Sequence, residues 1–175
     1  MFEIVQAPAT TTSKGIKLFI AGGIRNCPPW QNELIEKLQK DERIKEEIDE
    51  DEDIKIIILN PRCKEVPDEK SQTKWEYDNL KKSDIISFWF SEGSQNPITL
   101  FEYGSHLHNH IPLVVGCHPN YEKRNNVILQ TELAKHEIKV NQNFDEFYED
   151  LVDTLIGHIT QYRIRNLNKS MFNNK

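Results

Sequence analysis

Cysteine is scarce in this sequence, and the three that occur, Cys27, Cys63 and Cys117, form an odd set without a Cys-x-x-Cys spacing. A small disulfide-stapled domain needs paired cysteines, and a zinc knuckle needs closely spaced ones. The pattern argues against both classes and predicts reduced thiols.

Long hydrophobic runs are also missing. No apolar stretch approaches the ~20 residues that a membrane-spanning helix requires, and residues 1–14 lack the basic and apolar blocks of a signal peptide. We therefore expect no membrane segment and a cytoplasmic location. Basic residues without acidic neighbours gather only at residues 163–175, and the formal net charge is −6. Because such a chain repels a polyanion, polymeric nucleic acid is not an expected partner.

Two glycine-rich fingerprints of nucleotide binding are absent as well. The pair Gly22-Gly23 follows an apolar run, but neither Gly-x-Gly-x-x-Gly nor the Gly-Lys-Ser/Thr end of a phosphate loop occurs there. Dinucleotide and triphosphate binding therefore receive little support. The pair lets backbone amides approach a ligand closely, because glycine has no Cβ. A tight strand-to-helix turn explains the pair equally well.

The sequence does contain an alternation of short apolar runs and helical segments. The apolar runs predict buried strands at residues 17–21, 54–59, 85–90 and 113–116, with a weaker fifth at 138–140. Helical spacing covers residues 30–38, 69–82 and 99–107. A long final helix has a buried stripe of Phe144, Phe147, Leu151, Leu155 and Ile159. This alternation predicts one α/β domain with a doubly wound parallel five-stranded sheet of order 2-1-3-4-5.

The ends of the chain and one acidic segment are expected to lie outside this core. Residues 1–14 and 166–175 contain few apolar anchors, so they are predicted to be flexible arms around a domain of residues 15–165. Residues 41–53 hold nine carboxylates in thirteen positions. Ile44 and Ile48 could seat one helical turn there, but self-repulsion favours a solvated excursion.

The most informative stretch runs from Asn96 to Gly104, directly after the strand at 85–90. Ligands of an open parallel sheet bind beyond the carboxyl ends of its strands. Glu102 is expected there in the first turn of a helix, whose dipole would keep a nucleophilic carboxylate ionised. The alternative is a capping box, in which Glu102 only returns to the backbone amide of Thr99.

A series of motifs, in order along residues 17 to 130, resembles the nucleoside 2-deoxyribosyltransferase-like proteins. No single motif is very specific, and the resemblance depends on their number and order. The motifs are Ile20-Ala21-Gly22-Gly23-Ile24, Trp30-Gln31, Asn60-Pro61-Arg62, Trp75-Glu76, Ser83-Asp84-Ile85, Phe88-Trp89-Phe90, Pro97-Ile98-Thr99-Leu100-x-Glu102-x-Gly104 and Val115-Gly116-Cys117-His118-Pro119.

This resemblance implies a flavodoxin-like fold, no cofactor, and Glu102 as the group that attacks the anomeric carbon of a nucleoside. Glu76 is the better match for an acidic group near the base, with Asp78 as second choice, and Tyr103 would orient the nucleophile. Asn96 stands where transferases of the family carry an Asp six residues before the nucleophile. Because an amide cannot donate a titratable proton, the identity of the general acid stays open.

The same motifs suggest the substrate contacts. Glycine amides would line the sugar pocket, and aromatic rings, which could equally be core, would form walls for a planar base. Arg25 or Arg62 could provide a 5′-phosphate site. The predicted substrate-binding residues are Gly22, Gly23, Ile24, Trp30, Asn60, Arg62, Asp78, Trp89, Phe90, Asn96, Thr99 and His118.

The predicted function is cleavage of the N-glycosidic bond of a 2′-deoxynucleoside through a covalent Glu102 intermediate, which a second base or water resolves. The alternatives are a nucleoside 5′-monophosphate N-glycosidase and a non-catalytic nucleotide-sensing module. Metal binding by His106, His108 and His110 is not predicted, because no carboxylate or Cys completes a ligand set. Self-association is expected, with Phe144, Phe147 and Tyr148 as possible interface residues.

Overall fold

The computed structural model describes residues 1–49, 54–63 and 68–173. Its centre is one six-stranded sheet in which every neighbouring pair of strands is parallel. The spatial order of the strands is β1-β3-β2-β4-β5-β6. Their bounds are β1 Phe2–Gln6, β2 Ile16–Gly22, β3 Ile56–Asn60, β4 Ile85–Phe90, β5 Leu113–Cys117 and β6 Val140–Asn141.

The prediction of five strands is wrong, because the sheet has a sixth strand, β1. Without β1, the order of the remaining strands is the predicted 2-1-3-4-5. The segment Phe2–Gln6 lies in the predicted flexible arm, and that prediction is wrong here because the segment pairs along β3, with Phe2 beside Ile56 and Gln6 beside Asn60. An edge strand bonds to one neighbour only, so a short run with one well-buried side chain, Val5, gives a weak sequence signal.

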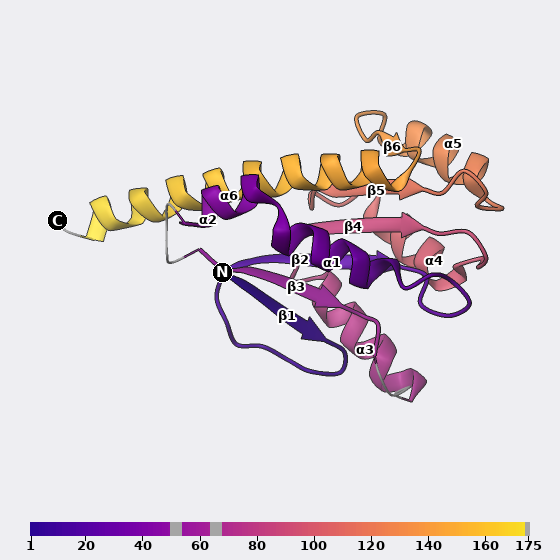
Figure 1. Cartoon of the computed structure of the whole chain (residues 1–175), viewed down its shortest axis with the longest axis horizontal. Coiled ribbons are helices and arrows are strands. Elements are labelled where there is room, and N and C mark those ends of the chain that lie inside the picture. The colour runs from indigo at the N-terminus through magenta and orange to yellow at the C-terminus, as the bar shows by residue number, and fades with distance from the viewer. Residues whose placement is uncertain (50–53, 64–67, 174–175) are drawn as a thin grey trace.

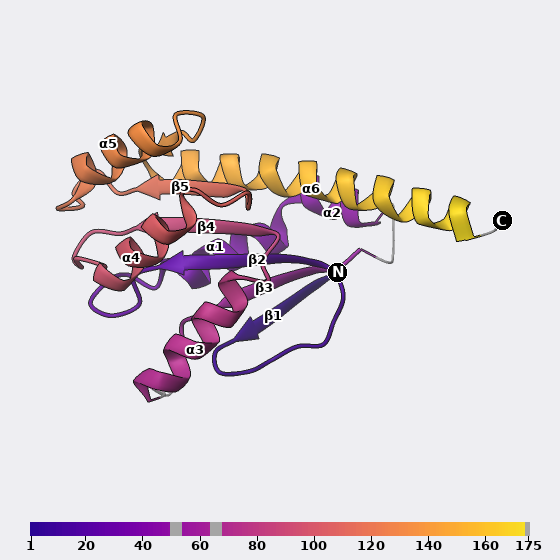
Figure 2. The ribbon, with the colours of Figure 1, turned by 180° about the vertical axis from the view of Figure 1, so that it is seen from behind.

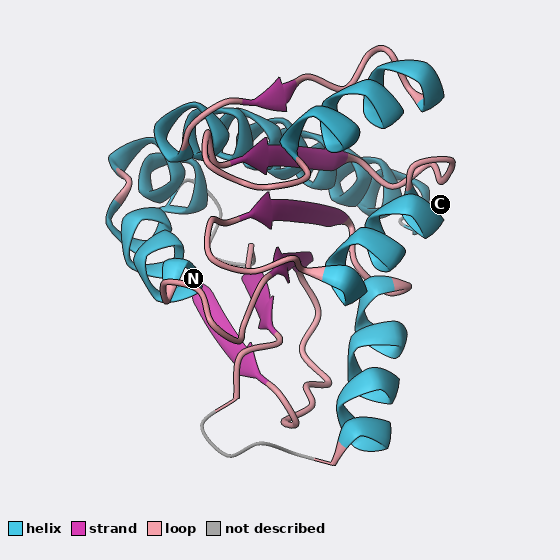
Figure 3. Cartoon of the chain, turned by 90° about the vertical axis from the view of Figure 1, so that its right-hand side faces the viewer, coloured by secondary structure: helices cyan, strands magenta, loops and turns pink. Residues whose placement is uncertain are grey.

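Within the described part of the chain, three helices cover each face of the sheet. Helices α1, α2 and α6 pack on one face in the first apolar cluster, and α3, α4 and α5 pack on the other in the second. Figures 1 and 2 view these two faces, and Figure 3 shows the sheet lying between the two layers. The bounds are α1 Trp30–Lys40, α2 Glu42–Asp49, α3 Glu69–Leu80, α4 Pro97–His106, α5 Arg124–Ala134 and α6 Phe144–Asn173.

The first part of the acidic segment forms helix α2, so its prediction as a solvated excursion is wrong for residues 42–49. Ile44 and Ile48 are buried in the core, and burying two Ile side chains stabilises by roughly 3–6 kcal/mol, more than exposed like charges cost. The remaining acidic positions, 50–53, lie outside the described residues.

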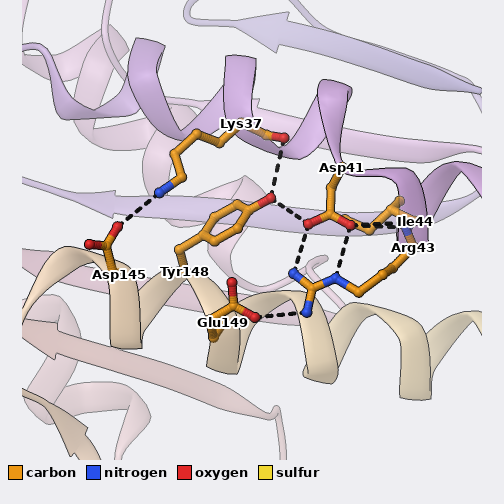
Figure 4. A network of polar contacts seen from close by, with 7 residues as sticks. All are labelled: Lys37, Asp41, Arg43, Ile44, Asp145, Tyr148 and Glu149. Carbon is orange, nitrogen blue, oxygen red and sulfur yellow. Dashed lines mark hydrogen bonds and ion pairs between the residues drawn. The ribbon is translucent and has the colours of Figure 1, made fainter.

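A polar network fastens the junction of α1 and α2 to α6 (Figure 4). Asp41 accepts hydrogen bonds from the Tyr148 hydroxyl at 2.6 Å and from Arg43 at 2.8 Å, and Arg43 also pairs with Glu149 at 2.7 Å. The hydrogen bond from Arg43 is the main reason why the pKa of Asp41 falls to about 2. The carboxylate also caps α2 through the Ile44 amide.

Helix α6 continues to Asn173, so the predicted flexible tail at residues 166–175 is wrong as far as residue 173. Figure 1 shows the helix extending past the end of the sheet. The expected domain boundary at residue 165 therefore falls inside a helix. The predicted stripe is confirmed, because Phe147, Leu151, Leu155 and Ile159 are fully buried and Phe144 is partly buried. Over the described residues, no helix is long and apolar enough to cross a membrane.

Candidate active site

The carboxyl ends of β2 and β4 mark the switch point of the sheet. Strand β2 lies between β3 and β4, so the chain leaves it first to one side and then to the other. Helices from these two crossovers cover opposite faces, and in open parallel sheets ligands bind in the crevice at such a point, here between the loops at residues 23–29 and 91–96. Figure 3 looks onto this edge, toward which the arrows of Figure 1 point.

Asn96 provides the clearest sign of a ligand site in this crevice. It precedes α4 in a left-handed conformation with φ of 49°. The residue is only 4% exposed, and neither atom of its amide has a hydrogen-bond partner among the described residues. The buried Ser91 hydroxyl, on the same loop, also lacks a partner within this part of the chain. Since buried polar groups are nearly always bonded, these atoms are available to bind an ordered water or a polar ligand.

The glycine pair permits close packing at the end of β2. A Cβ on Gly23 would lie 2.2 Å from Oδ1 of Asn96, and one on Gly22 would lie 2.4 Å from the Trp30 ring. The Gly23 carbonyl accepts hydrogen bonds from Trp30 Nε1 and Gln31 Nε2, both at 3.1 Å. A larger residue at either position would have to displace the Trp30 ring or the Asn96 side chain.

Glu102 lies in the second turn of α4, and not in the first turn as predicted. The helix begins at Pro97 after Asn96, so Thr99 is its third residue and cannot be the N-cap of a capping box. The capping interpretation of Glu102 is therefore wrong. The Thr99 side chain is buried against the sheet, whereas Glu102 is half-buried.

The electrostatic environment of Glu102 also differs from the expected ionised carboxylate. Burial, followed by repulsion from the nearby Glu76 carboxylate, raises the pKa of Glu102 to about 8. Burial raises the pKa of Glu76 as well. The helix dipole does not offset these effects, because it acts mainly within the first turn. Two interacting carboxyls at one place retain a proton at neutral pH, since ionising one opposes ionising the other.

Glu76 and Asp78 can be told apart by their partners. Glu76 accepts a hydrogen bond from Gln72 at 2.7 Å, and Gln72 also donates to the Pro61 carbonyl at 2.9 Å. Asp78, two residues further along α3, pairs with Lys74 at 2.6 Å, which lowers its pKa. Residues two apart point to different sides of a helix. Glu76 therefore faces Glu102, and the second choice, Asp78, lies on the surface.

Arg62 connects the loops after β3 and β2. Its Nε donates to Gln31 Oε1 at 3.0 Å, and its Nη2 donates to the Pro28 carbonyl at 3.3 Å. Asn60 Oδ1 accepts from the Arg62 backbone amide at 3.0 Å, so Asn60 shapes this loop and is itself buried. The residues described so far are linked in sequence by hydrogen bonds, close packing and the repulsion between the two carboxyls, and we call them the crevice ring. The crevice ring consists of Gly23, Gln31, Arg62, Gln72, Glu76, Asn96 and Glu102.

Most of the predicted aromatic walls are core residues. Trp30, Trp89 and Phe90 are each at least 97% buried, and Trp89 packs against Phe147 at 5.2 Å between ring centroids. Tyr103 is buried against Phe90, and its hydroxyl lies 2.5 Å from Thr131 Oγ1. Burial raises the pKa of Tyr103 to about 12. The Tyr103 hydroxyl therefore points toward α5 and contacts Thr131, so it does not orient Glu102.

The remaining predicted residues border the crevice. Ile24 is half-buried in the loop after Gly23, and half-buried His118 follows β5. The His118 Nδ1 atom accepts from the Asn120 amide at 3.1 Å, so this ring nitrogen is occupied. Sequence reasoning missed Gln31, Gln72 and Ser91 as site residues. Gln31 belongs to the Trp30-Gln31 motif, but the sequence does not show that it is fully buried or that it bonds Gly23 and Arg62.

Two features outside the crevice do not compete with it. A surface hollow of about 750 Å³ on α3 is bordered by Glu69, Thr73 and Tyr77 and does not reach the crevice ring. His106 is buried, and its Nδ1 donates to the Glu102 carbonyl at 2.7 Å. Within the described chain, no group of three or more potential ligands is placed to hold a metal ion.

Comparison with known proteins bears on the same region. No curated protein matches the chain. The family model described as nucleoside 2-deoxyribosyltransferase like matches residues 15–121, which include β2 to β5 and every member of the crevice ring. The α/β fold with its parallel sheet agrees with that match. The chain therefore belongs to the nucleoside 2-deoxyribosyltransferase-like family.

Proposed function

We propose that this protein cleaves the N-glycosidic bond of a 2′-deoxynucleoside and that Glu102 forms a covalent deoxyribosyl intermediate. Family membership supports glycosyl transfer on a small nucleoside-type substrate. The observations that carry the mechanism are the interacting pair of Glu102 and Glu76 and, at the start of the Glu102 helix, the buried Asn96 amide, which has no hydrogen-bond partner among the described residues. A retaining glycosidase uses two carboxyls in this way, one as nucleophile and one as acid.

In the first step the Glu102 carboxylate attacks C1′ while the bond from C1′ to the base nitrogen breaks. The proton held by the pair resides on Glu76 when Glu102 is ionised, and Glu76 gives it to the departing base. Gln72 bonds one Glu76 oxygen and so fixes the orientation of this acid. In the second step another base, or water, attacks C1′ from the vacated side and gives its proton to the Glu76 carboxylate. The bond from C1′ to Glu102 breaks, Glu102 leaves as a carboxylate, and the configuration at C1′ is retained.

Asn96 and Ser91 are placed to bind the substrate in this proposal. The Asn96 amide offers both a donor and an acceptor, and the Ser91 hydroxyl offers one of each. A sugar carries hydroxyl groups of the same dual character. The amide cannot act as the acid, which leaves that role to Glu76.

Mass spectrometry of the intact protein tests the covalent step. Incubation with a panel of 2′-deoxynucleosides should yield a deoxyribosyl adduct, which peptide mapping should locate on Glu102. The adduct should be missing in Glu102→Gln, because an amide cannot form the glycosyl ester. Glu132→Gln, on the exposed side of α5, is the matched control and should keep the adduct. Turnover by Glu102→Gln at more than about a tenth of the wild-type rate would contradict the mechanism, because that loss represents only ~1.4 kcal/mol of barrier.

Two rival activities give different results in the same assays. A pure hydrolase would release the base but would not exchange it for a second base supplied in solution. A nucleotide-sensing module would bind ligand without turnover and would still bind it in Glu102→Ala.

We also propose that the chain self-associates, although through a different surface from the one expected. Phe147 and Tyr148 are buried and Phe144 is partly buried within the chain, so these three residues are not free to form an interface. Large apolar side chains are instead exposed on the outer faces of α4 and α5. They are Ile98 at 63%, Phe101 at 77%, Leu129 at 57% and Leu133 at 83%.

Gly104 on α4 would let a second copy of the chain approach the helix backbone closely at this surface. A Cβ there would meet no atom within 4 Å, so no packing within the chain requires a glycine that costs helix stability. Analytical ultracentrifugation at micromolar concentration tests the proposal. A strictly monomeric, fully active protein would overturn it.

A further inference from the structure

The three cysteines of the chain lie in three different environments. Cys117 is fully buried, and burial raises the pKa of its thiol to about 11. Cys63 is half-buried, and its Sγ donates a hydrogen bond to Gln72 Oε1 at 4.0 Å. Cys27 is also half-buried, but its Sγ accepts a hydrogen bond, from Nη2 of Arg62 at 3.9 Å. The sulfur of Cys27 thus combines access to solvent with a cationic donor.

The direction of these hydrogen bonds bears on reactivity, because the thiolate and not the thiol attacks other sulfur atoms. A thiolate can only accept hydrogen bonds, so Arg62 can bond the attacking form of Cys27. The bond from Cys63 to Gln72 needs the proton on the sulfur and is lost when the proton leaves. The Arg62 guanidinium is held beside Cys27, since its Nε donates to Oε1 of the fully buried Gln31. These contacts favour reaction at Cys27 over Cys63.

The Cys27 sulfur also lies beside the buried amide of Asn96. Cys27 Sγ is 3.0 Å, and Asn96 Oδ1 is 2.2 Å, from the position that a Gly23 Cβ would occupy. Neither polar atom of this amide has a hydrogen-bond partner among the described residues, so both are available to a polar group attached to the sulfur. The chain neighbours of Cys27, Asn26 and Pro28, are exposed. A small reagent can therefore reach the sulfur from solvent.

We propose that Cys27 is a modification site, at which a polar low-molecular-weight disulfide forms a mixed disulfide that closes the candidate active site. The Cys27 thiol gives its proton to solvent, and the thiolate attacks one sulfur of the small disulfide. The bond between the two sulfurs of that molecule breaks, and its second sulfur leaves as a thiolate. The attached group lies beside Asn96, which is placed to bind the substrate, so the closure of the site rests on the proposed function.

Mass spectrometry of the folded protein treated with glutathione disulfide tests the modification without any substrate. Peptide mapping over a time course should show the adduct on Cys27 at least about tenfold faster than on Cys63, as expected when one of two thiols is activated. In urea that unfolds the chain, the two thiols should react at similar rates, because their folded surroundings are lost. Dithiothreitol should remove the adduct.

Matched variants separate the roles of the sulfur and of its cationic neighbour. Cys27→Ser should lose the fast adduct, whereas Cys63→Ser should keep it. Arg62→Gln should slow the reaction of Cys27 by about tenfold, since the donor to the thiolate no longer carries a charge. If Arg62→Gln lowers the melting temperature, Arg62→Lys decides, because it retains the charge and should react at an intermediate rate.

Binding measurements on Glu102→Gln test the closure of the site without turnover. Calorimetric titration with 2′-deoxynucleosides before and after treatment with glutathione disulfide should show binding weakened by at least about tenfold, equivalent to ~1.4 kcal/mol. The double variant Cys27→Ser, Glu102→Gln, treated in the same way, should bind as before. Dithiothreitol should restore the binding of the treated Glu102→Gln protein.

Three outcomes would overturn the inference. They are an adduct that forms on Cys63 as fast as on Cys27 in the folded protein, a Cys27 rate that both Arg62 variants leave unchanged, and a Cys27 adduct that leaves nucleoside binding unchanged. A Glu102→Gln protein that binds no nucleoside before treatment would overturn the closure of the site, whereas the adduct map still decides the modification. The proposed function fails separately, if wild-type protein forms no deoxyribosyl adduct on Glu102.

Discussion

Replacement of Glu102 by Gln should change the pH dependence of stability as well as activity. The pKa of Glu102 is raised from its ordinary value of 4.5 to about 8 in the folded chain. Between these two values the folded state keeps a proton that the unfolded state releases. Wild-type stability from this group is therefore fully present below pH 4.5 and is lost as the pH rises toward 8. Gln does not titrate, so the variant lacks this loss.

The size of the effect follows from the pKa difference. One proton changes the free energy of unfolding by at most ~1.4 kcal/mol per pH unit, and over the range from pH 4.5 to 8 this adds up to ~5 kcal/mol. Glu102 is half-buried, and solvent screening reduces the interaction to about half, or ~2–3 kcal/mol. For a chain of this size, that change is equivalent to roughly 4–12 °C in melting temperature.

Urea denaturation of both proteins at pH 5, 6, 7 and 8 measures this quantity directly. The free energy of unfolding of Glu102→Gln, minus that of wild type, should grow steadily with pH. Titrations of groups that do not interact with Glu102 affect both proteins alike and cancel in the difference, so the difference reports on Glu102 and its partner Glu76. Glu132→Gln, in an exposed position, should give a constant difference. If the Glu102→Gln difference also stays constant to within about 0.5 kcal/mol, Glu102 does not have the raised pKa on which the carboxyl-pair argument depends.

Three further predictions concern other parts of the molecule. Glu76→Gln removes the charge that opposes ionisation of Glu102, so the rise of kcat/KM with pH should begin at lower pH. The same change removes the proposed general acid, so kcat should fall by about 10²- to 10⁴-fold. A pH–rate profile that keeps its position would refute the coupling of the two carboxyls. Asp41→Ala should lower the free energy of unfolding by about 1–3 kcal/mol at pH 7. Because the folded chain lowers the pKa of Asp41 from 3.8 to about 2, the stability that the Asp41 carboxylate contributes is fully present above pH 3.8, and the difference between the two proteins should vanish as the pH falls through 2. Gly23→Ala should lower the melting temperature and weaken ligand binding, whereas Gly104→Ala should leave the monomer as stable or more stable by about 0.5–1 kcal/mol; thermal melts of both variants side by side check this contrast.

The sheet was largely predictable because its signals are local. Strands β2 to β5 are short apolar runs, and each ends at loop residues that the sequence shows without any tertiary information. The alternation with helices restricts the topology, and the observed order of these strands agrees with the prediction. The place of Glu102 beyond β4 follows from the same reasoning, because ligands bind at the carboxyl edge of a parallel sheet.

The boundaries and the edge elements were less predictable, since non-local contacts decide them. Strand β1 depends on pairing with β3, and α2 depends on burial of Ile44 and Ile48. Asn96 in its left-handed conformation places the start of α4 at Pro97. That shift of a few residues moves Glu102 out of the first turn and excludes the capping box.

The sequence by itself determined the fold class, the family motifs and the residue types available at the switch point. Only the tertiary structure decided their electrostatics and their partners. The pKa of Glu102 depends on burial and on Glu76 from another helix, which no local pattern encodes. The hydrogen bonds of Arg62 to Gln31 and Pro28 join loops that follow two different strands. Charge interactions and desolvation depend on distance in space, and folding sets those distances between residues far apart in the chain.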